Sequence, residues 1–354
     1  MNIYYLIYFL LFLLSLTKKF EINSDNYLVK KKIIFFTFLL LFIFIGFRDE
    51  IGGDDFRYQL YYESIHLGLE NFSTGTEHKQ KPLFYFINSF ASFFNLGVVF
   101  VNCVAAFIFS VSLIIFCIFS GNLFLGLMLA MPILIIVIAM GYVTQSVALA
   151  FLMLAYLQFI KNNKFFFIIL IVLGATFHPS VIIFTPLILA LILSRNNLKE
   201  SFVLALIGTT ILIIFYDYFY EMANNYIGSN LVSNGTIFRL ALNFMSVVIF
   251  SFFIKKEKMQ KNYKILIYFY CILSTVLIVI VPFGIGTTAI DRIALYLTPI
   301  QILIIIKFLN SNYSIHSRKA VSSIFFIIYL VFMFVWFSFS YYSQDWIPYR
   351  NIIF

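Results

Sequence analysis

The chain has 354 residues, of which 62% are hydrophobic, 20% aromatic and 11% charged, and its mean hydropathy is +0.99. Soluble proteins carry about 25% charged residues, so this chain has too little polar surface to cover a soluble globule. The composition thereby excludes a soluble enzyme, a coiled coil and a disordered chain. It predicts a polytopic membrane protein, and the excess of 47 Phe and 23 Tyr over 7 Pro and 15 Gly favours long helices over a membrane barrel.

The apolar runs along the chain predict an all-α bundle of about 10 to 12 transmembrane helices, because a helix needs about 20 apolar residues to cross the hydrocarbon layer. We expect one transmembrane domain over residues 1–354. The predicted spans are 2–17, 33–47, 98–119, 122–140, 145–160, 165–177, 179–194, 201–217, 237–254, 265–282, 289–309 and 321–341.

Two stretches do not fit a simple crossing. The run 165–177 is short, and Phe177-His178-Pro179 marks either a turn between two spans or a break within one longer element. Residues 83–95 are too short to span and predict a re-entrant or interfacial helix.

The charged residues alternate between the predicted connections. Connections 18–32, 161–164, 195–200, 255–264 and 307–319 hold 17 of the 24 basic residues and 4 of the 15 acidic ones. Lys and Arg mark the cytoplasmic side of a membrane protein, so this set is predicted to face the cytoplasm. The net charge of +9 is therefore a signal of topology and indicates no nucleic-acid partner.

The first apolar run lacks a basic region before it and a small-residue cleavage site after it, so we expect it to be retained as a span with an outward N-terminus. The three cysteines lie inside apolar runs without paired spacing and suggest neither a disulfide framework nor a metal cluster. The predicted cytoplasmic loops offer no Gly-rich phosphate loop and no carboxylate cluster. We expect no metal, no cofactor and no nucleotide-driven reaction.

The longest outward connection, 48–82, concentrates charge beside the membrane, which is unfavourable unless the charges are used or well solvated. Gly52-Gly53 predicts a turn, and Asp54 or Asp55 is placed to cap a following helix. On that helix an aromatic stripe is suited to lie in the membrane interface. It consists of Tyr58, Tyr61, Tyr62 and Ile65. The alternative is a solvated loop that ends in an interfacial helix.

Three further features lie at predicted outer helix ends. His178 has the chemistry of a general base or of a hydrogen-bond donor to phosphate, although a histidine at a helix junction is often structural. Arg292 suits phosphate binding, whereas an interfacial ion pair with Asp291 is the alternative. Thr144-Gln145 opens a span from the outside, which helix capping also explains.

These features belong to an ordered series of short motifs. The first is Phe47-Arg48-Asp49-Glu50-Ile51-Gly52-Gly53-Asp54-Asp55-Phe56-Arg57-Tyr58. The others are Lys81-Pro82-Leu83-Phe84-Tyr85 with Asn88, Gly141 through Gln145 with Ala148, Ala175-Thr176-Phe177-His178-Pro179-Ser180, Arg292 with Tyr296, and Trp346-Ile347-Pro348-Tyr349-Arg350-Asn351. In this order they resemble the EpsG family, polysaccharide polymerases of the O-antigen polymerase (Wzy) type, over nearly the whole chain.

The resemblance implies a bacterial cytoplasmic (inner) membrane protein that makes O-antigen, capsule or exopolysaccharide. Such a polymerase takes polyprenyl-pyrophosphate-linked oligosaccharide units on the outer face and transfers the growing chain onto a new unit. It is a glycosyltransferase that needs neither nucleotide nor metal, and a chain-length regulator is a possible protein partner. In one departure, this chain has Thr144-Gln145 where the family usually has Arg-Gln.

The predicted reaction sets the roles of the residues. The growing charge on the pyrophosphate requires cations, for which we select Arg292 and Arg48, with Arg57 behind them. Asp54 and His178 are the candidate bases for the acceptor hydroxyl. Asp291 is expected to orient Arg292, and the tyrosines of the outer loop are expected to stack on sugar rings. The catalytic set is Asp54, His178 and Arg292, and the substrate-binding set is Arg48, Arg57, Tyr58, Gln145, Asp291 and Tyr296.

Other functions remain open at this stage. A polysaccharide acyltransferase would need a His paired with Asp or Ser and a cytoplasmic acyl-donor site, and the short cytoplasmic loops disfavour it. A flippase or transporter of the lipid-linked unit would place ionisable residues near the midplane and show related halves, and here the charges cluster at the outer ends. An O-antigen ligase shares the donor chemistry and differs only in the acceptor.

Overall fold

The computed structural model of the protein describes residues 2–17, 27–69, 81–185, 187, 235–254, 258–283, 287–311 and 315–353. Over these residues the chain is helical, and β structure is limited to an isolated bridge between Arg48 and Asn351. The expected all-α fold is confirmed. The elements are α1 (Asn2–Ser15), α2 (Tyr27–Gly46), α3 (Asp55–His66), α6 (Pro82–Phe93), α7 (Gly97–Ser120), α8 (Leu123–Ala130), η2 (Met131–Ala139), α9 (Val143–Ile160), α10 (Lys164–Ala175), η3 (Pro179–Phe184), α14 (Thr236–Ile249), η4 (Phe250–Ile254), α15 (Lys261–Ile280), η5 (Val281–Phe283), α16 (Thr287–Ser311), α17 (Ile315–Phe339) and η6 (Tyr341–Trp346).

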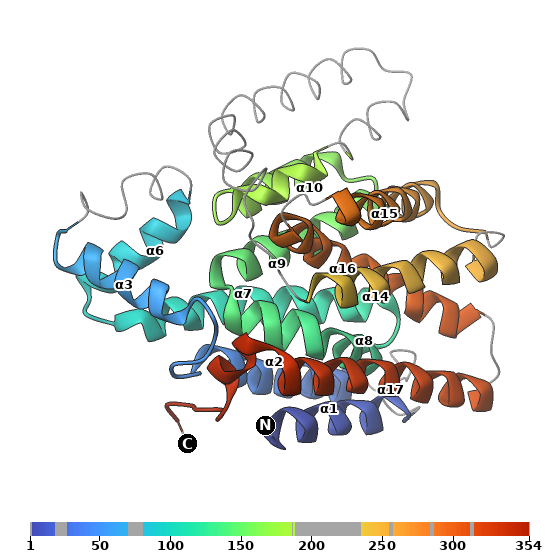
Figure 1. Ribbon diagram of the computed structural model, residues 1–354, viewed down its shortest axis with the longest axis horizontal. Coiled ribbons are helices and arrows are strands. Elements are labelled where there is room, and N and C mark those ends of the chain that lie inside the picture. Colours follow the sequence, from blue (N-terminus) through green and yellow to red (C-terminus); the bar gives the residue numbers. More distant parts are fainter. Residues whose placement is uncertain are drawn as a thin grey trace, which may run out of the picture.

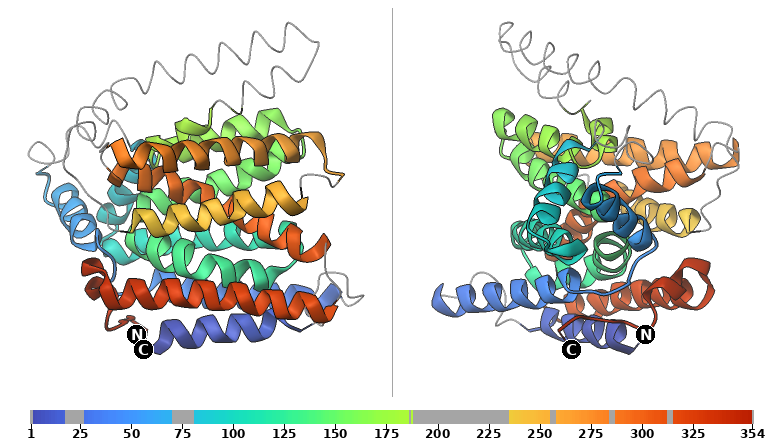
Figure 2. Two further views of the ribbon diagram at one scale, coloured as in Figure 1. Left: turned by 45° about the vertical axis from the view of Figure 1, so that its right-hand side comes forward. Right: turned by 90° about the vertical axis from the view of Figure 1, so that its left-hand side faces the viewer.

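The helices run side by side as a bundle, as Figures 1 and 2 show. Six helices of the described part are long and apolar enough to cross a membrane. They are Gly97–Ser120, Val143–Ile160, Thr236–Phe253, Lys261–Ile280, Thr287–Asn310 and Ser317–Phe339. This confirms a polytopic membrane bundle. Half of the predicted span 179–194 and all of 201–217 lie outside the described residues.

The bundle has two chemically different ends. At one, which we call the α3 end, lie α3, α6 and the C-terminal segment (Figure 1, left). The opposite end, which we call the lysine-rich end, holds the starts of α2, α10 and α15, with Lys30 to Lys32, Lys164 and Lys261. The helices therefore bring the described parts of connections 18–32, 161–164 and 255–264, which were predicted to share a side, to the same end.

The core of the bundle is the α8–η2 segment, in which every residue from Leu123 to Ala139 is buried. Around it, 83% of the apolar window of α9 and of α16 is buried, against 28% for α15 and α17. The latter two helices are therefore peripheral and present apolar side chains outward. The turn into α8 is sharp because α7 ends at left-handed Gly121 and the Asn122 side chain then caps the Leu125 amide at 3.0 Å.

The π-helical part of this core segment anchors the end of the chain. The indole N–H of Trp346, on η6, donates to the carbonyl oxygen of Ile136 at 2.8 Å. Trp346 is 1% exposed, and its own carbonyl oxygen accepts from the Tyr4 hydroxyl on α1 at 2.9 Å. The C-terminal segment is thus held against the bundle core.

The α3 helix follows the predicted turn, but its aromatic stripe does not lie in the membrane interface. Tyr61, Tyr62 and Ile65 are buried, because α6 covers this face. The Tyr61 and Phe84 rings stack with centroids 5.4 Å apart, and the Gly97 amide donates to the Tyr62 hydroxyl at 3.2 Å. The expectation that Tyr61 and Tyr62 face lipid or stack on sugars is therefore wrong.

The short helix predicted over 83–95 is α6, which lies beside α3 at the end of the bundle and keeps several phenylalanines exposed. The His178 junction is a break: α10 ends at Ala175, and the buried 3₁₀ segment η3 begins at Pro179. Phe184 then packs between Tyr156 of α9 and Tyr296 of α16, with ring centroids 5.8 and 5.9 Å away. The chain after His178 thus turns into the bundle.

Candidate functional site

The turn before α3 depends on a close approach to the N-terminal end of α9. Gly52 has φ +116°, and a Cβ there would lie 2.3 Å from the Met140 carbonyl oxygen and 2.8 Å from the Gly141 Cα. Glycine allows both the backbone conformation and the contact. The turn places Asp54 at the N-cap of α3, near Tyr142. Burial, and then the negative charge of Asp54, raise the pKa of Tyr142.

The same turn is tied to the C-terminal segment. The Gly52 amide donates to the Asp345 carbonyl at 3.1 Å, and the Asp49 amide donates to the Arg350 carbonyl at 3.2 Å. Arg350 and Glu50 also form an exposed ion pair. Residues 345–351 therefore brace the loop that carries Asp54, and this contact brings the first and last predicted motifs together.

Arg48 is buried beneath this loop and does not reach its outer surface. The residue is only 2% exposed. Its guanidinium donates to the carbonyls of Ile45 (2.7 Å) and Ile51 (3.3 Å) and to Asn102 Oδ1 (3.1 Å). These contacts fix the path of the chain between α2 and the turn. The geometry gives Arg48 a positioning role, in contrast to the predicted pyrophosphate contact.

Arg57 lies on the outer surface of α3. Its side chain is 78% exposed, and it is 3.8 Å from the Asp54 carboxylate. An exposed pair of this kind contributes about 0 to 1 kcal/mol. Arg57 thus partners Asp54 from the solvent side, and the structure does not bring it to the buried residues described next.

His178 is held by a hydrogen-bonded group that combines two of the predicted motifs. Its Nδ1 is 2.6 Å from Ser180 Oγ, and the Ser180 hydroxyl donates to the Tyr296 hydroxyl at 2.8 Å. All three residues are buried. Tyr296 is itself fixed, because its carbonyl oxygen accepts from the Tyr156 hydroxyl at 3.1 Å. The imidazole ring is therefore oriented by α9, η3 and α16.

Two positive charges act on this imidazole. Burial lowers the pKa of His178 well below its ordinary value of 6.5, and the charges of Lys81 and Arg292 lower it further. His178 is therefore neutral at pH 7, with one ring nitrogen that donates and one that accepts. Lys81 and Arg292 are both half-buried, on segments that are distant in sequence. The three side chains together suit an anionic group with a polar substituent.

The segment that carries Arg292 is fixed by an ion pair inside the bundle. Both oxygens of the Asp291 carboxylate accept from the guanidinium of Arg239 on α14, and the two residues are 8% and 7% exposed. Gln145 Nε2 donates to the Arg292 carbonyl at 3.4 Å. The sequence-based role for Asp291 was to orient Arg292. The structure adds Arg239 as its bidentate partner, so Asp291 also joins α14 to α16.

Tyr58 connects α3 to the start of α9. Burial raises the pKa of Tyr58, and hydrogen bonds from the side chain and backbone of Thr144 oppose the rise. Thr144 stands where the resemblance described above predicts an arginine, and here its hydrogen bonds to Tyr58 link α3 to α9. The cations that act on His178 are instead Lys81 and Arg292.

The structure thus brings together seven of the predicted residues at the α3 end, and it sets Arg48 behind them and Arg57 outside them. The seven are Asp54, Tyr58, Gln145, His178, Asp291, Arg292 and Tyr296. It adds four residues that the prediction did not select: Lys81, Tyr142, Ser180 and Arg239. Arg239 had a detectable signal, because a basic residue inside an apolar run is expected to have a specific partner.

The comparisons agree with the order of the motifs. A sequence model of the EpsG family matches residues 31–351, a range that contains every residue of the candidate site. Comparison with curated proteins and with solved structures gave no match.

Proposed function

The chain belongs to the EpsG family, a family of polysaccharide polymerase-like membrane proteins, and from this premise we propose that it is a glycosyltransferase acting on lipid-linked sugars. It joins polyprenyl-pyrophosphate-linked oligosaccharide repeat units at the outer face of the bacterial cytoplasmic membrane. The product is the polysaccharide of an O-antigen, a capsule or an exopolysaccharide.

The charge pattern supports the orientation that this proposal needs. Lysines gather at the lysine-rich end, which the positive-inside rule assigns to the cytoplasm. The candidate site lies at the α3 end and therefore faces outward. A donor with its own pyrophosphate bond needs no nucleotide, which agrees with a site on the side of the membrane that has no ATP supply.

The observation that carries the proposal is that Lys81 and Arg292 lie near enough to the buried His178 for their charges to lower its pKa. Three motifs that are distant in the chain supply two cations and a polar ring beside one another at the end of an apolar bundle. Cations held in a partly water-excluded site stabilise charge that develops on a leaving group. A lipid pyrophosphate is such a group, and its hydrocarbon tail remains in the membrane.

In the proposed step the bond between the sugar carbon and the phosphate oxygen of the donor breaks, and the lipid pyrophosphate leaves with the electron pair. Arg292 and Lys81 bind its negative charge. The acceptor hydroxyl forms the new carbon–oxygen bond and gives its proton to Asp54, the half-buried carboxylate of the site. His178 donates or accepts a hydrogen bond at the reacting sugar or phosphate.

The surrounding residues position these groups. Gln145 and the Arg239–Asp291 pair hold the N-terminal part of α16, from which Arg292 extends. Ser180 and Tyr296 hold the His178 ring. Tyr58 and Tyr142 lie beside Asp54, and their half-buried rings are the surfaces that we assign to the sugars.

The test is the size distribution of surface polysaccharide in a strain that lacks this protein, complemented with wild type or Arg292→Ala at matched abundance. We expect the loss of long chains while single repeat units still reach the cell surface, with rescue by wild type and not by Arg292→Ala. Units trapped on the cytoplasmic side would indicate a flippase. A full-length polymer that lacks a substituent would indicate an acyltransferase, and a polymer that is not joined to its final acceptor would indicate a ligase.

A further inference from the structure

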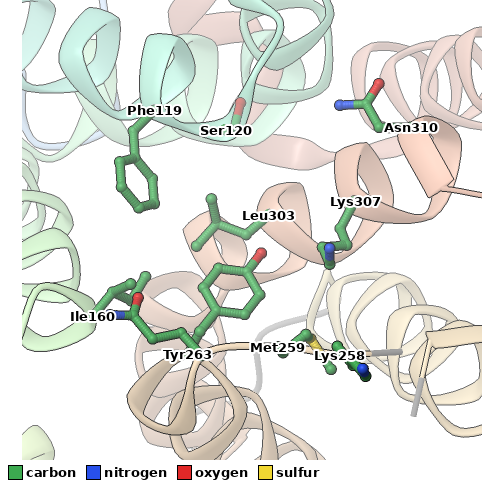
Figure 3. Close-up of a pocket in the computed structure, with 10 residues that line it drawn as sticks. Phe119, Ser120, Ile160, Lys258, Met259, Tyr263, Leu303, Lys307 and Asn310 are labelled. Atoms are coloured by element: carbon green, nitrogen blue, oxygen red, sulfur yellow. The ribbon is translucent and has the colours of Figure 1, made fainter. Parts of the chain in front are cut away.

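A second candidate site lies at the lysine-rich end, across the bundle from the residues described above. There an open cavity of about 400 Å³ is lined by the last turns of α7, α9 and α16, the segment before α15 and the first turn of α15. Figure 3 shows the side chains from these elements around one common space. Its lining residues come from segments that are distant in the sequence, so the cavity forms only when the bundle is assembled.

The lining of this cavity is polar over about half of its surface, and its described charged residues are both lysines. Lys307 extends from α16 and Lys258 from the segment before α15 (Figure 3), and the described lining residues include no acid. The other polar lining residues are Ser120, Gln260, Tyr263 and Asn310. A third cation lies close by, because the Lys161 ammonium is 6.0 Å from the centroid of the Phe119 ring, which also lines the cavity. Such a lining recognises an anion with several oxygen acceptors.

Helix dipoles of both signs meet at this cavity. Three helices end at the cavity, and the negative ends of their dipoles favour lysines nearby. The N-terminus of α15, a helix of 20 residues, lies at the same cavity, and the positive end of its dipole favours an anion. If the lysines served only to neutralise helix ends, their removal would destabilise the protein equally in the presence and absence of an anion.

Two exposed phenylalanines of η4 lie near the residue that follows Lys307, and they distinguish between the possible anions. The Phe253 and Phe308 rings have centroids 5.1 Å apart, and Phe308 directly follows Lys307. Phe252 and Phe253 are 76% and 53% exposed. A free phosphate would use only the polar lining. A phospholipid would use the lining for its headgroup and the exposed phenylalanines for an acyl chain.

We propose that this cavity binds the phosphate headgroup of an anionic membrane phospholipid, with Lys258 and Lys307 as its main ligands. Basic pockets between helices at the cytoplasmic side of membrane proteins suit such headgroups. The bound lipid joins the ends of α7, α9, α15 and α16, and it lies at the opposite end from the sugar-transfer site. The proposal is independent of which reaction that site performs.

The test uses the full-length protein, purified in detergent and titrated with phosphatidylglycerol, with phosphatidylcholine or with inorganic phosphate, while the thermal unfolding temperature and the bound lipid by native mass spectrometry are recorded. We expect phosphatidylglycerol to bind and to raise the unfolding temperature. In Lys258→Gln/Lys307→Gln its affinity falls about 25-fold, because each lysine near an anionic surface contributes about fivefold. The control Lys31→Gln/Lys32→Gln removes the same charge from exposed positions on α2 and keeps wild-type affinity.

A second variant, Lys258→Arg/Lys307→Arg, keeps the charge and is expected to retain binding within about threefold, which guards against a folding defect in the first. Equal affinity of the two Gln double variants would overturn the proposal. So would an equal response to phosphatidylcholine, or a stabilisation that inorganic phosphate reproduces without lipid. A loss of stability in Lys258→Gln/Lys307→Gln that is the same with and without lipid would assign the lysines to the helix ends alone.

Discussion

Asp291 on α16 is bound through both carboxylate oxygens by Arg239, which stands 52 positions earlier in the chain on α14. The pair is buried, so its charges depend on one another and not on water. Asp291 directly precedes Arg292, the cation to which we assign the binding of the pyrophosphate. The packing of α14 on α16 therefore determines where Arg292 is placed.

Removal of one partner of this pair is expected to destabilise the protein strongly. Asp291→Asn leaves the Arg239 charge buried, and Arg239→Gln leaves the Asp291 charge buried; each is expected to cost about 3 to 5 kcal/mol. Arg239→Met/Asp291→Leu replaces both charges by apolar groups and is expected to restore most of that stability while polymer formation stays low. Thermal unfolding of detergent-purified protein measures the cycle. Strictly additive single and double effects would contradict the coupling.

The transmembrane helices could be predicted from sequence because long apolar runs have one solution in a membrane, which is a helix with its own hydrogen bonds satisfied. The predicted runs 98–119 and 145–160 correspond to α7 and α9 within a few residues. Contacts between distant segments were not predictable in this way. The α3 stripe was recognised, but the sequence does not show that Phe84 of α6 covers it.

The site was predictable as an ordered set of motifs and not as a geometry. The placement of Asp54, His178 and Arg292 at the end of the bundle opposite the lysines follows from charge and helix order. Arg48 was predicted to bind the substrate, but it is buried in the bundle. The sequence does not reveal this, because an arginine after a span has the same local pattern whether it faces solvent or the bundle. Arg239 was not selected because its partner is far away in sequence and no periodicity connects them.

The Gly52 turn gives a prediction that isolates a single contact. Gly52→Ala puts a Cβ 2.3 Å from the Met140 carbonyl and must move the Asp54 loop away from α9. Gly68→Ala is the matched control, because Gly68 also has positive φ, +67°, and nothing lies within 4 Å of its Cβ position. Both variants carry a backbone strain of about 1 to 2 kcal/mol, and only Gly52→Ala carries the clash. We expect long polymer to be lost only in Gly52→Ala, at equal abundance; equal polymer profiles would refute the role of the contact.

The cations around His178 are expected to matter far more than the one outside the site. Arg292→Ala and Lys81→Ala remove charge from the proposed pyrophosphate position, and each is expected to lower polymerisation about 10²- to 10³-fold. Arg57→Ala, at a side chain that is 78% exposed, is expected to change it less than about tenfold. The assay is polymer synthesis in membranes supplied with lipid-linked repeat units, normalised to protein abundance. A larger loss for Arg57→Ala than for Arg292→Ala would return Arg57 to the substrate-binding set.

His178 predicts how the stability of the protein depends on pH. Burial, Lys81 and Arg292 lower its pKa in the folded state below the ordinary 6.5. As pH falls below 6.5, the unfolded chain binds a proton at this residue that the folded protein does not bind. The folded state then loses up to about 1.4 kcal/mol per pH unit until the pH reaches the folded pKa, and His178 contributes nothing to the pH dependence above 6.5.

His178→Asn keeps a polar partner for Ser180 and cannot take up the proton, so its stability is expected to fall less steeply in acid than that of wild type. Lys81→Gln removes one of the two charges that hold the pKa of His178 down, so the folded pKa rises and the acid-sensitive range narrows. Thermal unfolding of the purified variants between about pH 5 and pH 8 measures both effects. The carboxylates titrate in every variant, so the difference from wild type isolates His178, and parallel pH profiles for wild type and His178→Asn would show that the imidazole is not held neutral.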